Sequence, residues 1–348
     1  MELAIEPMLA KAVTTVPEQD SVPGGLSYEP KWDGFRAIVY WDGETVEIGS
    51  RGAKSLTRYF PELVAAASAQ LPEPCVLDGE IVVRQGVGGS EHLAAAEHLS
   101  WEALSQRIHP AASRVATLAV ETPASFVAFD LLGLGSTSLL EAPFVDRRAA
   151  LQQLFAGLTA PLHLTRETTD VALARRWLVE FEGAGLDGVM SKPLDAAYAP
   201  GRRVMLKTKH VRTADVVLIG YRVHKSGTGV GSLLLGLYDD AGELRSVGGA
   251  SAFTDLRRRD LIDELAPLIA DDPHGEGERS RFSGGRDMSF VRLRPERVLE
   301  VKYDQMEGDR FRHTVQFLRW RPDRDARSCT FEQLEVPAGY DLAEVLAD

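Results

Sequence analysis

The stretch Lys31-Trp32-Asp33-Gly34-Phe35-Arg36 decides the fold and the chemistry that we expect of this chain, because it places a lysine at a tight turn after a strand. An Asp-Gly pair favours a turn, and Arg36 is spaced to return toward the pocket of Lys31. A lysine amine attacks phosphorus only when it is neutral, and its ordinary pKa is about 10.4. A nucleophilic lysine therefore needs burial, a divalent cation or neighbouring cations. The alternative is a surface turn that carries a solvated lysine.

Length and composition indicate a globular protein with two domains. The chain has 348 residues, of which 44% are hydrophobic and 26% charged. Its two cysteines, Cys75 and Cys329, lack partners at metal-ligand spacing, so we expect reduced thiols and no zinc site. The N-terminus lacks the pattern of a signal peptide, and no run of 18 apolar residues occurs. We therefore expect a cytoplasmic protein that has no membrane partner.

The charges are unevenly distributed. A net charge of −12 argues against a uniformly basic nucleic-acid binder. However, residues 202–225 contain seven Lys and Arg against the single acid Asp215, and residues 310–327 contain six Arg against Asp323 and Asp325. These clusters predict either a phosphate-binding track or two solvated faces.

The pattern of predicted elements changes near residues 208–213. Before this point, strands such as 26–29, 37–41 and 81–83 mix with amphipathic helices. After residue 214, short strands separated by Gly-rich turns favour a small Greek-key barrel of the OB type. We therefore predict domains over residues 1–210 and 211–348, with a mobile loop over 271–287.

Several further strand ends carry charged or aromatic residues that could line one cleft with Lys31. Nucleotide transfer needs such residues: carboxylates for a hard cation, cations for phosphate charge and an aromatic ring for a base. The stretches concerned are Ser50-Arg51-Gly52, Asp78-Gly79-Glu80, Phe129-Asp130-Leu131-Leu132, Asp187-Gly188-Val189-Met190-Ser191-Lys192 and Lys207-Thr208-Lys209.

These motifs, in this order, resemble the covalent nucleotidyltransferase superfamily of ATP-dependent DNA ligases and mRNA-capping enzymes. The chain is most similar to the small, stand-alone C-type bacterial ligases, from Lys31 to Asp323. The resemblance implies an α+β fold, in which a nucleotidyltransferase (ATP-grasp-like adenylation) domain is followed by a C-terminal OB-fold β-barrel.

The resemblance also implies roles for the residues around the turn. Lys31 matches the lysine that becomes covalently adenylylated, and Asp33 and Lys209 are expected to act with it in catalysis. Arg36 matches the arginine that contacts the ribose. Glu29 matches the position that accepts a hydrogen bond from the adenine amino group. A carboxylate there distinguishes the two purines, because adenine offers a donor at this position and guanine an acceptor.

Four further residues are expected at the nucleotide. Arg51 matches the residue that touches the ribose or the 5′-phosphate of the nick, and Glu80 matches an acid at the ribose and metal. Phe129 matches the ring that stacks on adenine, although the sequence leaves open whether Phe126 takes this place. Lys192 is expected to bind the nucleotide as well.

The remaining matches concern phosphate and metal. Lys207 and Lys209 match the paired lysines of the α-phosphate, and Arg321 and Asp323 match the C-terminal motif that orients the leaving pyrophosphate. Mg²⁺ or Mn²⁺ is expected at Glu80 and Asp187. Two residues depart from the family pattern: Asp187 stands where most relatives have Glu, and Arg324 where they have Lys.

The predicted activity is an ATP-dependent DNA ligase that seals 3′-hydroxyl/5′-phosphate nicks in duplex DNA, for repair and recombination. ATP is favoured over NAD for two reasons. Only 30 residues precede Lys31, too few for the nicotinamide-recognition domain of NAD-dependent ligases, and two cysteines cannot form the zinc module of those enzymes. We expect a monomer at the nucleoid that works with a repair polymerase or end-binding proteins. The alternatives are a capping guanylyltransferase, an RNA ligase, or a non-catalytic DNA-binding scaffold of the same fold.

Overall fold

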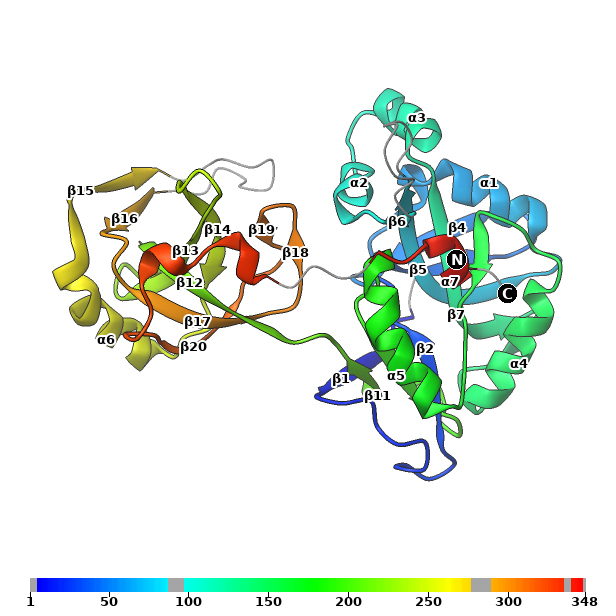
Figure 1. The fold of residues 1–348 in the computed structure, drawn as a ribbon. Helices are drawn as coiled ribbons and strands as arrows, with labels where there is room; N and C mark the ends of the chain where they lie inside the picture. Colours follow the sequence, from blue (N-terminus) through cyan, green and yellow to red (C-terminus); the bar gives the residue numbers. More distant parts are fainter. Residues whose placement is uncertain (1–4, 87–96, 277–288, 335–338, 347–348) are drawn as a thin grey trace. The chain divides into compact units, whose positions relative to one another are not determined.

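The chain forms two compact units in a computed structural model that describes residues 5–86, 97–276, 289–334 and 339–346 (Figure 1). The first unit comprises residues up to 209 together with residues 339–346, and the second comprises residues 210–334. The units therefore divide within the interval where the sequence pattern changes. The structure differs from the predicted second domain at its end, because Tyr340 and helix α7 (Leu342–Leu346) pack on the first unit.

The first unit is built around two β-sheets. One has the order β1-β11-β10-β2, and the other has the order β4-β3-β5-β7-β8, with β6 beside β5 and β9 beside β7. The strands of the first sheet are β1 (Leu9–Val13), β11 (Arg203–Thr208), β10 (Val189–Pro193) and β2 (Leu26–Pro30). Those of the second are β3 (Phe35–Trp41), β4 (Val46–Ser50), β5 (Cys75–Gln85), β6 (His98–Leu99), β7 (Ala124–Leu134), β8 (Thr137–Ser138) and β9 (Leu162–Leu164).

Helices cover the outer faces of these sheets. Leu63 of α1 and Leu151 of α4 are buried with Ile48 and Leu77 on one face of the second sheet. Helix α5 lies against β2 and β10, and its Trp177 joins the core beneath them (Figure 1). The helices of this unit are α1 (Pro61–Gln70), α2 (Trp101–Gln106), α3 (Ala112–Glu121), α4 (Phe144–Phe155) and α5 (Val171–Glu180), with 3-10 turns at Thr57–Tyr59 and Phe181–Ala184.

A cluster of apolar side chains lies between the facing surfaces of the two sheets. Ile38 and Leu132 of the second sheet are buried against Met205 of the first, together with Met8 and Tyr198. Met8 precedes β1, which pairs in parallel with β11. This cluster fixes the separation of the sheets beside the cavity described below.

The second unit is a curled, largely antiparallel sheet. Strand β12 bends along its length, pairing with β17 through residues 212–217 and with β13 through residues 217–223. Leu261 and Leu265 of α6 are buried in the core that this sheet encloses. The elements are β12 (Arg212–Val223), β13 (Val230–Tyr238), β14 (Leu244–Ala250), α6 (Asp255–Leu265), β15 (Ile269–Glu276), β16 (Ser289–Leu293), β17 (Val298–Tyr303), β18 (Met306–Glu307), β19 (Arg310–Phe311) and β20 (Gln316–Trp320), with 3-10 turns at Ala266–Leu268, Ala326–Ser328 and Phe331–Gln333.

One expectation about this unit is wrong. The predicted mobile loop over 271–287 begins within strand β15, which pairs with β16 up to Glu276. Gly and charged residues are common in loops, but here Gly275 lies beneath the ring of Phe290, where a Cβ would come within 2.2 Å of Cζ. Residues 277–287 of that prediction lie outside the described residues.

Candidate active site

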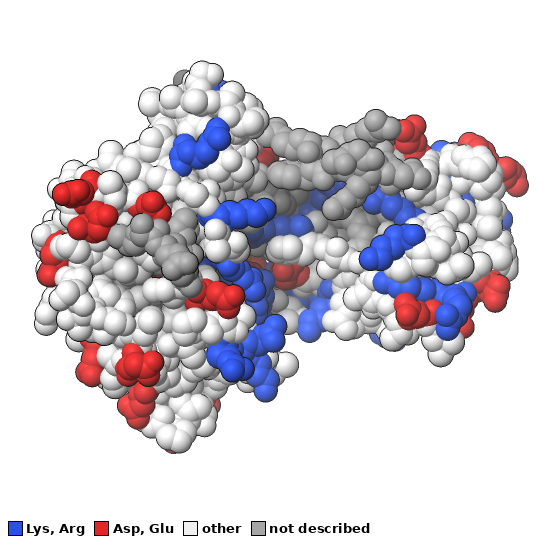
Figure 2. Space-filling view, turned by 180° about the vertical axis from the view of Figure 1, so that it is seen from behind, with Lys and Arg blue, Asp and Glu red and all other residues white. Residues whose placement is uncertain are grey.

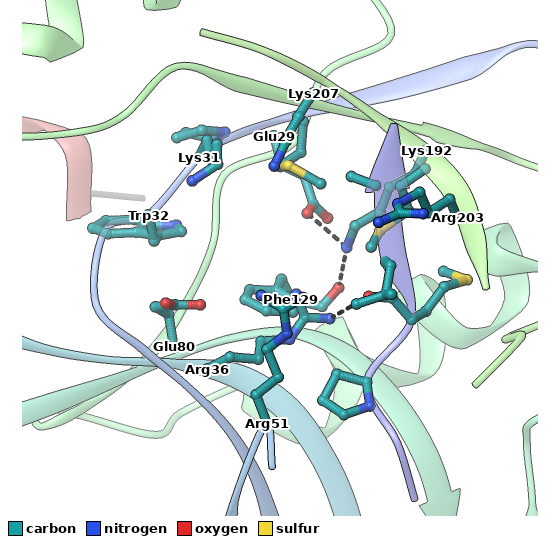
Figure 3. A pocket seen from close by; sticks show the side chains of 17 residues that line it. Glu29, Lys31, Trp32, Arg36, Arg51, Glu80, Phe129, Lys192, Arg203 and Lys207 are labelled. Carbon is teal, nitrogen blue, oxygen red and sulfur yellow. Dashed lines mark hydrogen bonds and ion pairs between the residues drawn. The ribbon is translucent and has the colours of Figure 1, made fainter. Parts of the chain in front are cut away.

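One face of the first sheet presents a row of chemically active side chains. Met190 is in register with Glu29 on one side and with Lys207 on the other, so the three side chains point to the same face. Alternation along the strands adds Lys192 and Arg203 to this face. All five residues line a cavity of about 260 Å³ (Figure 3).

The turn that carries Lys31 is held against the end of β10 by two backbone hydrogen bonds. The Lys31 N–H donates to the carbonyl of Gly188 at 2.8 Å, and the Asp187 N–H donates to the carbonyl of Lys31 at 2.9 Å. Two glycines make this approach possible. A Cβ on Gly34 would lie 2.1 Å from the carbonyl oxygen of Ile81, and Gly188 has a φ of +136° with the Thr208 carbonyl oxygen 2.1 Å from the same position.

Asp187 is shared by two ammonium groups. Its Oδ2 lies 2.5 Å from Nζ of Lys31 and 2.7 Å from Nζ of Lys209. The Asp187 side chain is only 9% exposed, so little water screens these contacts. Asp187 therefore holds Lys31 and Lys209 beside each other.

Lys207 is a further cation at the cavity. Among the described residues it forms no ion pair, and its side chain is half-buried. Burial lowers the pKa of Lys207, and the positive charges of Lys31 and Lys209 lower it further. An entering anion would relieve both effects.

The second sheet faces the cavity with Arg36 and Glu80, which are register partners on β3 and β5. Arg36 forms a two-point ion pair with the fully buried Asp78, at 2.5 Å from Nε to Oδ1 and 2.6 Å from Nη2 to Oδ2. Glu80 is half-buried, and burial raises its pKa to about 7, although Arg36 and Lys31 act against this rise. Glu80 is thus a carboxylate that would gain from a cation.

The choice between the two phenylalanines follows from strand alternation. Phe129 lines the cavity, with its ring 4.4 Å below the guanidinium carbon of Arg36. Phe126 points to the opposite face of β7, where it is buried in the core beneath α1 and α4. A Cβ on Gly79 would lie 2.3 Å from the Phe126 ring, so the glycine leaves room for that packing. Phe129, and not Phe126, therefore presents its ring to the cavity.

Glu29 is a buried carboxylate beside Phe129. Its Oε2 lies 2.7 Å from Nζ of Lys192, which also donates to the Phe129 carbonyl at 2.8 Å (Figure 3). Oε1 is buried and accepts no hydrogen bond from the described residues, and the nearest guanidinium nitrogen of Arg148 is 3.8 Å away. Burial raises the pKa of Glu29, whereas Lys192 and Arg148 lower it. A buried acceptor that receives no hydrogen bond from the described residues is suited to a ligand that brings a donor.

Arg51 and Trp32 also line the cavity. Arg51, in the exposed turn after β4, lines it from the second sheet. Trp32 is buried, and its Nε1 donates to Oγ1 of Thr165 at 2.8 Å, which fixes the plane of the indole ring. In Figure 3 the amines of Lys31 and Lys207 lie on one side of the cavity, and Glu80 lies across from them.

The structure thus brings together eight of the predicted site residues: Glu29, Lys31, Arg36, Arg51, Glu80, Phe129, Lys192 and Lys207. Asp187 joins them through its ion pair with Lys31, and Lys209 joins them through its ion pair with Asp187. Asp33 is not among the described residues that line the cavity. Arg321 and Asp323 belong to the second unit.

Arg321 and Asp323 form an ion-pair cluster within the second unit. Nη1 of Arg321 contacts both carboxylate oxygens of Asp215, at 2.9 and 3.0 Å, and Nη2 contacts Oδ2 of Asp323 at 2.8 Å. Arg324 also approaches Asp215, with 3.3 Å between Nε and Oδ2. The hydrogen bond from Arg321 lowers the pKa of Asp323 to about 2. The cluster is therefore largely neutralised by its own members.

The sequence reasoning missed several residues of these sites. Trp32 lies within the opening motif, but no role was predicted for it, and it lines the cavity. Arg203 lies two residues from Met205 on the face of Lys207, so strand alternation from Lys207 predicts its position. Asp215 was counted only as the one acid of a basic stretch, and nothing in that pattern indicates its partner Arg321.

Basic side chains are also grouped on the surface. Figure 2 shows Lys and Arg gathered on one side of the first unit, with acidic side chains on its other side. This separation allows an acidic protein to offer a local surface to a polyanion.

Two family models match the chain. One, described as ATP dependent DNA ligase domain, matches residues 7–209, and the other, described as ATP dependent DNA ligase C terminal region, matches residues 226–324. The chain belongs to the ATP-dependent DNA ligase family. The prediction of an ATP-dependent DNA ligase is thereby confirmed, and neither the capping enzyme nor the scaffold protein is favoured.

Curated relatives support this family assignment over nearly the whole ligase chain. DNA ligase C2 of Mycolicibacterium smegmatis is 56% identical over 351 residues, covering 96% of this chain and 95% of that protein. DNA ligase C of Mycobacterium tuberculosis is 53% identical over 362 residues, covering 98% of this chain and 97% of that protein. The predicted similarity to C-type bacterial ligases is confirmed.

A solved structure shows the same fold. A Lig E DNA ligase, described as DNA binding with a minimal scaffold, covers 90% of this chain and 99% of its own, with a TM-score of 0.56 and 19% identity. The predicted fold class, a ligase nucleotidyltransferase domain with a C-terminal domain, is confirmed. No helix among the described residues of this ligase is long and apolar enough to cross a membrane.

Proposed function

We propose that this ligase seals nicks in duplex DNA through a covalent bond between Nζ of Lys31 and AMP. Neutral Nζ attacks the α-phosphorus of ATP, so that a P–N bond forms and pyrophosphate leaves. AMP then passes to the 5′-phosphate of the nick. The adjacent 3′-hydroxyl attacks that phosphate and expels AMP, which closes the strand.

The observation that carries the proposal is the gathering of Lys31, Lys207, Glu29 and Phe129 around one cavity. Glu29 lies on β2, Lys31 in the turn that follows it, Lys207 on β11 and Phe129 on β7. Together they offer a nucleophile, a phosphate cation, a base-edge acceptor and a stacking ring. The free Oε1 of Glu29 is suited to the amino group of adenine, because guanine presents a carbonyl at that position. This favours ATP over GTP as the donor.

The phosphate groups of ATP are assigned to the lysine side of the cavity. Lys207 has no counter-ion among the described residues, and Lys31 and Lys209 already lie within 2.7 Å of a common carboxylate oxygen. An α-phosphate beside them would face three amines, which stabilise the charge that develops during attack. Asp33 remains a proposal from the motif alone.

The sugar is assigned to the second sheet. Arg36 and Glu80 line the cavity across from the lysines, and Arg51 extends this surface toward solvent. We assign Arg36 and Glu80 to the ribose hydroxyls, and Arg51 to the ribose or the 5′-phosphate of the nick. Lys192 holds Glu29 and Phe129 in place for the base.

A divalent cation fits Glu80 better than it fits Asp187. The described residues contain no group of three or more His, Cys, Asp or Glu that could hold a metal ion, so phosphate oxygens would have to complete the coordination shell. Glu80, with its pKa raised by burial, is a suitable ligand, whereas Oδ2 of Asp187 is engaged by two lysines. Mg²⁺ or Mn²⁺ held at Glu80 would offset phosphate charge, and a place for Asp187 in its coordination remains a prediction.

We assign Arg321 and Asp323 to the orientation of the leaving pyrophosphate, because they match the C-terminal motif that has this role in the family. We further assign the ligase to DNA repair and recombination in the cytoplasm, at the nucleoid, as a monomer that works with a repair polymerase or end-binding proteins. Sealing rates on nicked duplexes with DNA or RNA on either side of the nick would define its substrate.

The proposal is tested by replacing the nucleophile. Lys31→Ala should abolish transfer of label from α-labelled ATP to the protein, because it removes the amine that is proposed to form the P–N bond. Lys54→Ala, in the exposed turn after β4, is the matched control and should label normally. A labelled AMP adduct that persists in Lys31→Ala would refute the assignment.

A further inference from the structure

Tyr198 lies outside every motif noted in the sequence, yet its hydroxyl joins two walls of the cavity. The side chain is 3% exposed, and it lies between β10 and β11 in the chain. The hydroxyl donates to Oδ2 of Asp78 at 2.6 Å and accepts the N–H of Met8 at 2.9 Å. One hydroxyl thus connects the second sheet to the segment that precedes β1.

The same two partners are connected a second time through Arg36. Asp78 holds the Arg36 guanidinium at two points, and Nη2 of Arg36 reaches the carbonyl of Met8 at 3.5 Å. The four groups therefore form a closed ring: Tyr198 to Asp78, Asp78 to Arg36, Arg36 to the Met8 carbonyl, and the Met8 N–H back to Tyr198. Each member restricts the position of the next.

Two members of this ring, Arg36 and Met8, line the cavity, whereas Tyr198 and Asp78 support them from behind. The Arg36 guanidinium also lies over the Phe129 ring, with its carbon 4.4 Å from the ring centre. Asp78 is fully buried, so its carboxylate needs every donor that it has. Without the Tyr198 hydroxyl, Asp78 would keep Arg36 as its partner but lose the bond that fixes its orientation.

The hydroxyl acts as a donor over the whole working pH range. Burial raises the pKa of Tyr198 far above its ordinary value, and the charge of Asp78 raises it further. The proton therefore stays between the tyrosine oxygen and Asp78.

We propose that Tyr198 is a positioning residue that sets Arg36 and the Met8 wall for the sugar of ATP, and that it thereby determines discrimination between ribose and deoxyribose. This inference rests on the proposed placement of the ribose beside Arg36. Tyr198 touches no reacting atom, and it acts through Asp78 and Met8.

Tyr198→Phe removes the hydroxyl and keeps the ring. Tyr40→Phe is the matched control, because the Tyr40 hydroxyl accepts the N–H of Ile5 at 3.3 Å in the same N-terminal segment, and its ring is also buried. Enzyme–AMP formation would be measured with ATP, 2′-deoxy-ATP and 3′-deoxy-ATP. We expect the KM for ATP to rise about fivefold in Tyr198→Phe with kcat within about twofold, since the lost hydrogen bond to the Asp78 carboxylate reaches the nucleotide only through Arg36 and Met8.

The decisive readout is selectivity, which a loss of stability alone would not change. In Tyr198→Phe the preference for ATP over at least one deoxynucleotide should fall by the same factor as the KM rises, whereas Tyr40→Phe should keep it. If Tyr198→Phe does not fold, Asp78→Asn, which keeps the side-chain volume, should show the same fall in preference.

Unchanged selectivity in the folded variant, or a wild-type enzyme that uses ATP and both deoxynucleotides equally, would overturn this inference while leaving the adenylylation proposal intact. Failure of the proposed function is recognised separately, because the wild-type enzyme would then form no AMP adduct with any of the three nucleotides.

Discussion

The cavity of the first unit and the Arg321 cluster of the second unit use cations in opposite ways. Lys207 lines the cavity and has no ion-pair partner among the described residues, and its pKa is lowered by burial and by its neighbours. Arg321, in contrast, contacts two carboxylates, those of Asp215 and Asp323. The cavity therefore has positive charge that a polyphosphate can neutralise directly. In the cluster, Arg321 can bind a phosphate only after it releases one of its two carboxylate partners.

This difference follows from where the carboxylates lie. At the cavity, Asp78 and Asp187 form ion pairs with Arg36 and Lys31, whereas no carboxylate of the described residues forms an ion pair with Lys207. In the second unit, Asp215 is positioned by two hydrogen bonds between its backbone and the side chain of Gln333, and it meets both Arg321 and Arg324. Asp323 is 63% exposed, so it is the partner that Arg321 can release most easily.

Among the variants that test this comparison, the largest change in the rate of adenylylation should come from removing the charge of Lys207. Lys207→Met keeps the length of the side chain but removes the charge, so enzyme–AMP formation should fall about a hundredfold, the loss expected for a charged contact to phosphate. Lys54→Met is the control and should be unaffected. Equal rates of AMP labelling in both variants would show that the cavity does not bind the phosphates.

The pH dependence of the adenylylation rate should report the ionisation of Glu80. Because the pKa of Glu80 is raised to about 7, the rate should rise about tenfold between pH 6 and pH 8 as Glu80 ionises, and this limb should disappear in Glu80→Gln. Added Mg²⁺ should move the limb to lower pH, since a cation favours the carboxylate.

The stability profile gives an independent measure of the same group. The folded-state pKa of Glu80 lies above its ordinary value of 4.5, so ionisation destabilises the folded state as the pH rises from about 4.5 to about 7. Thermal unfolding of Glu80→Gln should lack this loss of stability. A limb or a loss that survives in the variant would have to come from another group.

The smallest effect is expected at the neutralised cluster. Asp215→Asn weakens the anchor of Arg321, so adenylylation should fall about fivefold, while sealing of DNA that is already adenylylated should be unchanged. Glu300→Gln is the matched control, because Glu300 is the register partner of Asp215 and contacts Arg319 instead. Faster adenylylation in Asp215→Asn would mean that the cluster inhibits the first step.

Much of the site followed from local rules. The motifs assigned Glu29, Lys31 and Lys207 to one site, and in the structure the turn at Asp33-Gly34 and alternation along the strands account for their positions at the cavity. Alternation also separates Phe126 from Phe129, because three positions along a strand lead to the opposite face. These features depend on neighbouring residues, and local sequence determines them.

Other elements could not be predicted from such rules. Strand β1 has only five residues, and it becomes a strand because β11 offers a parallel edge at the cavity. Helix α7 returns to the first unit because Leu342 and Val345 find an apolar surface beside Phe181, which no local pattern reveals. Contacts of this kind, between residues far apart in the chain, form only once the sheets are in place.

The sequence alone determined which chemical groups this ligase has and on which side of each strand they lie. Tertiary structure decided which charge each of them meets. Lys31 and Asp187 are 156 residues apart in the chain and Asp215 and Arg321 are 106 apart, yet each pair is within 3.0 Å in the folded protein. Because electrostatic energy depends on distance through space and on burial, only the folded chain distinguishes the uncompensated Lys207 from the neutralised Arg321.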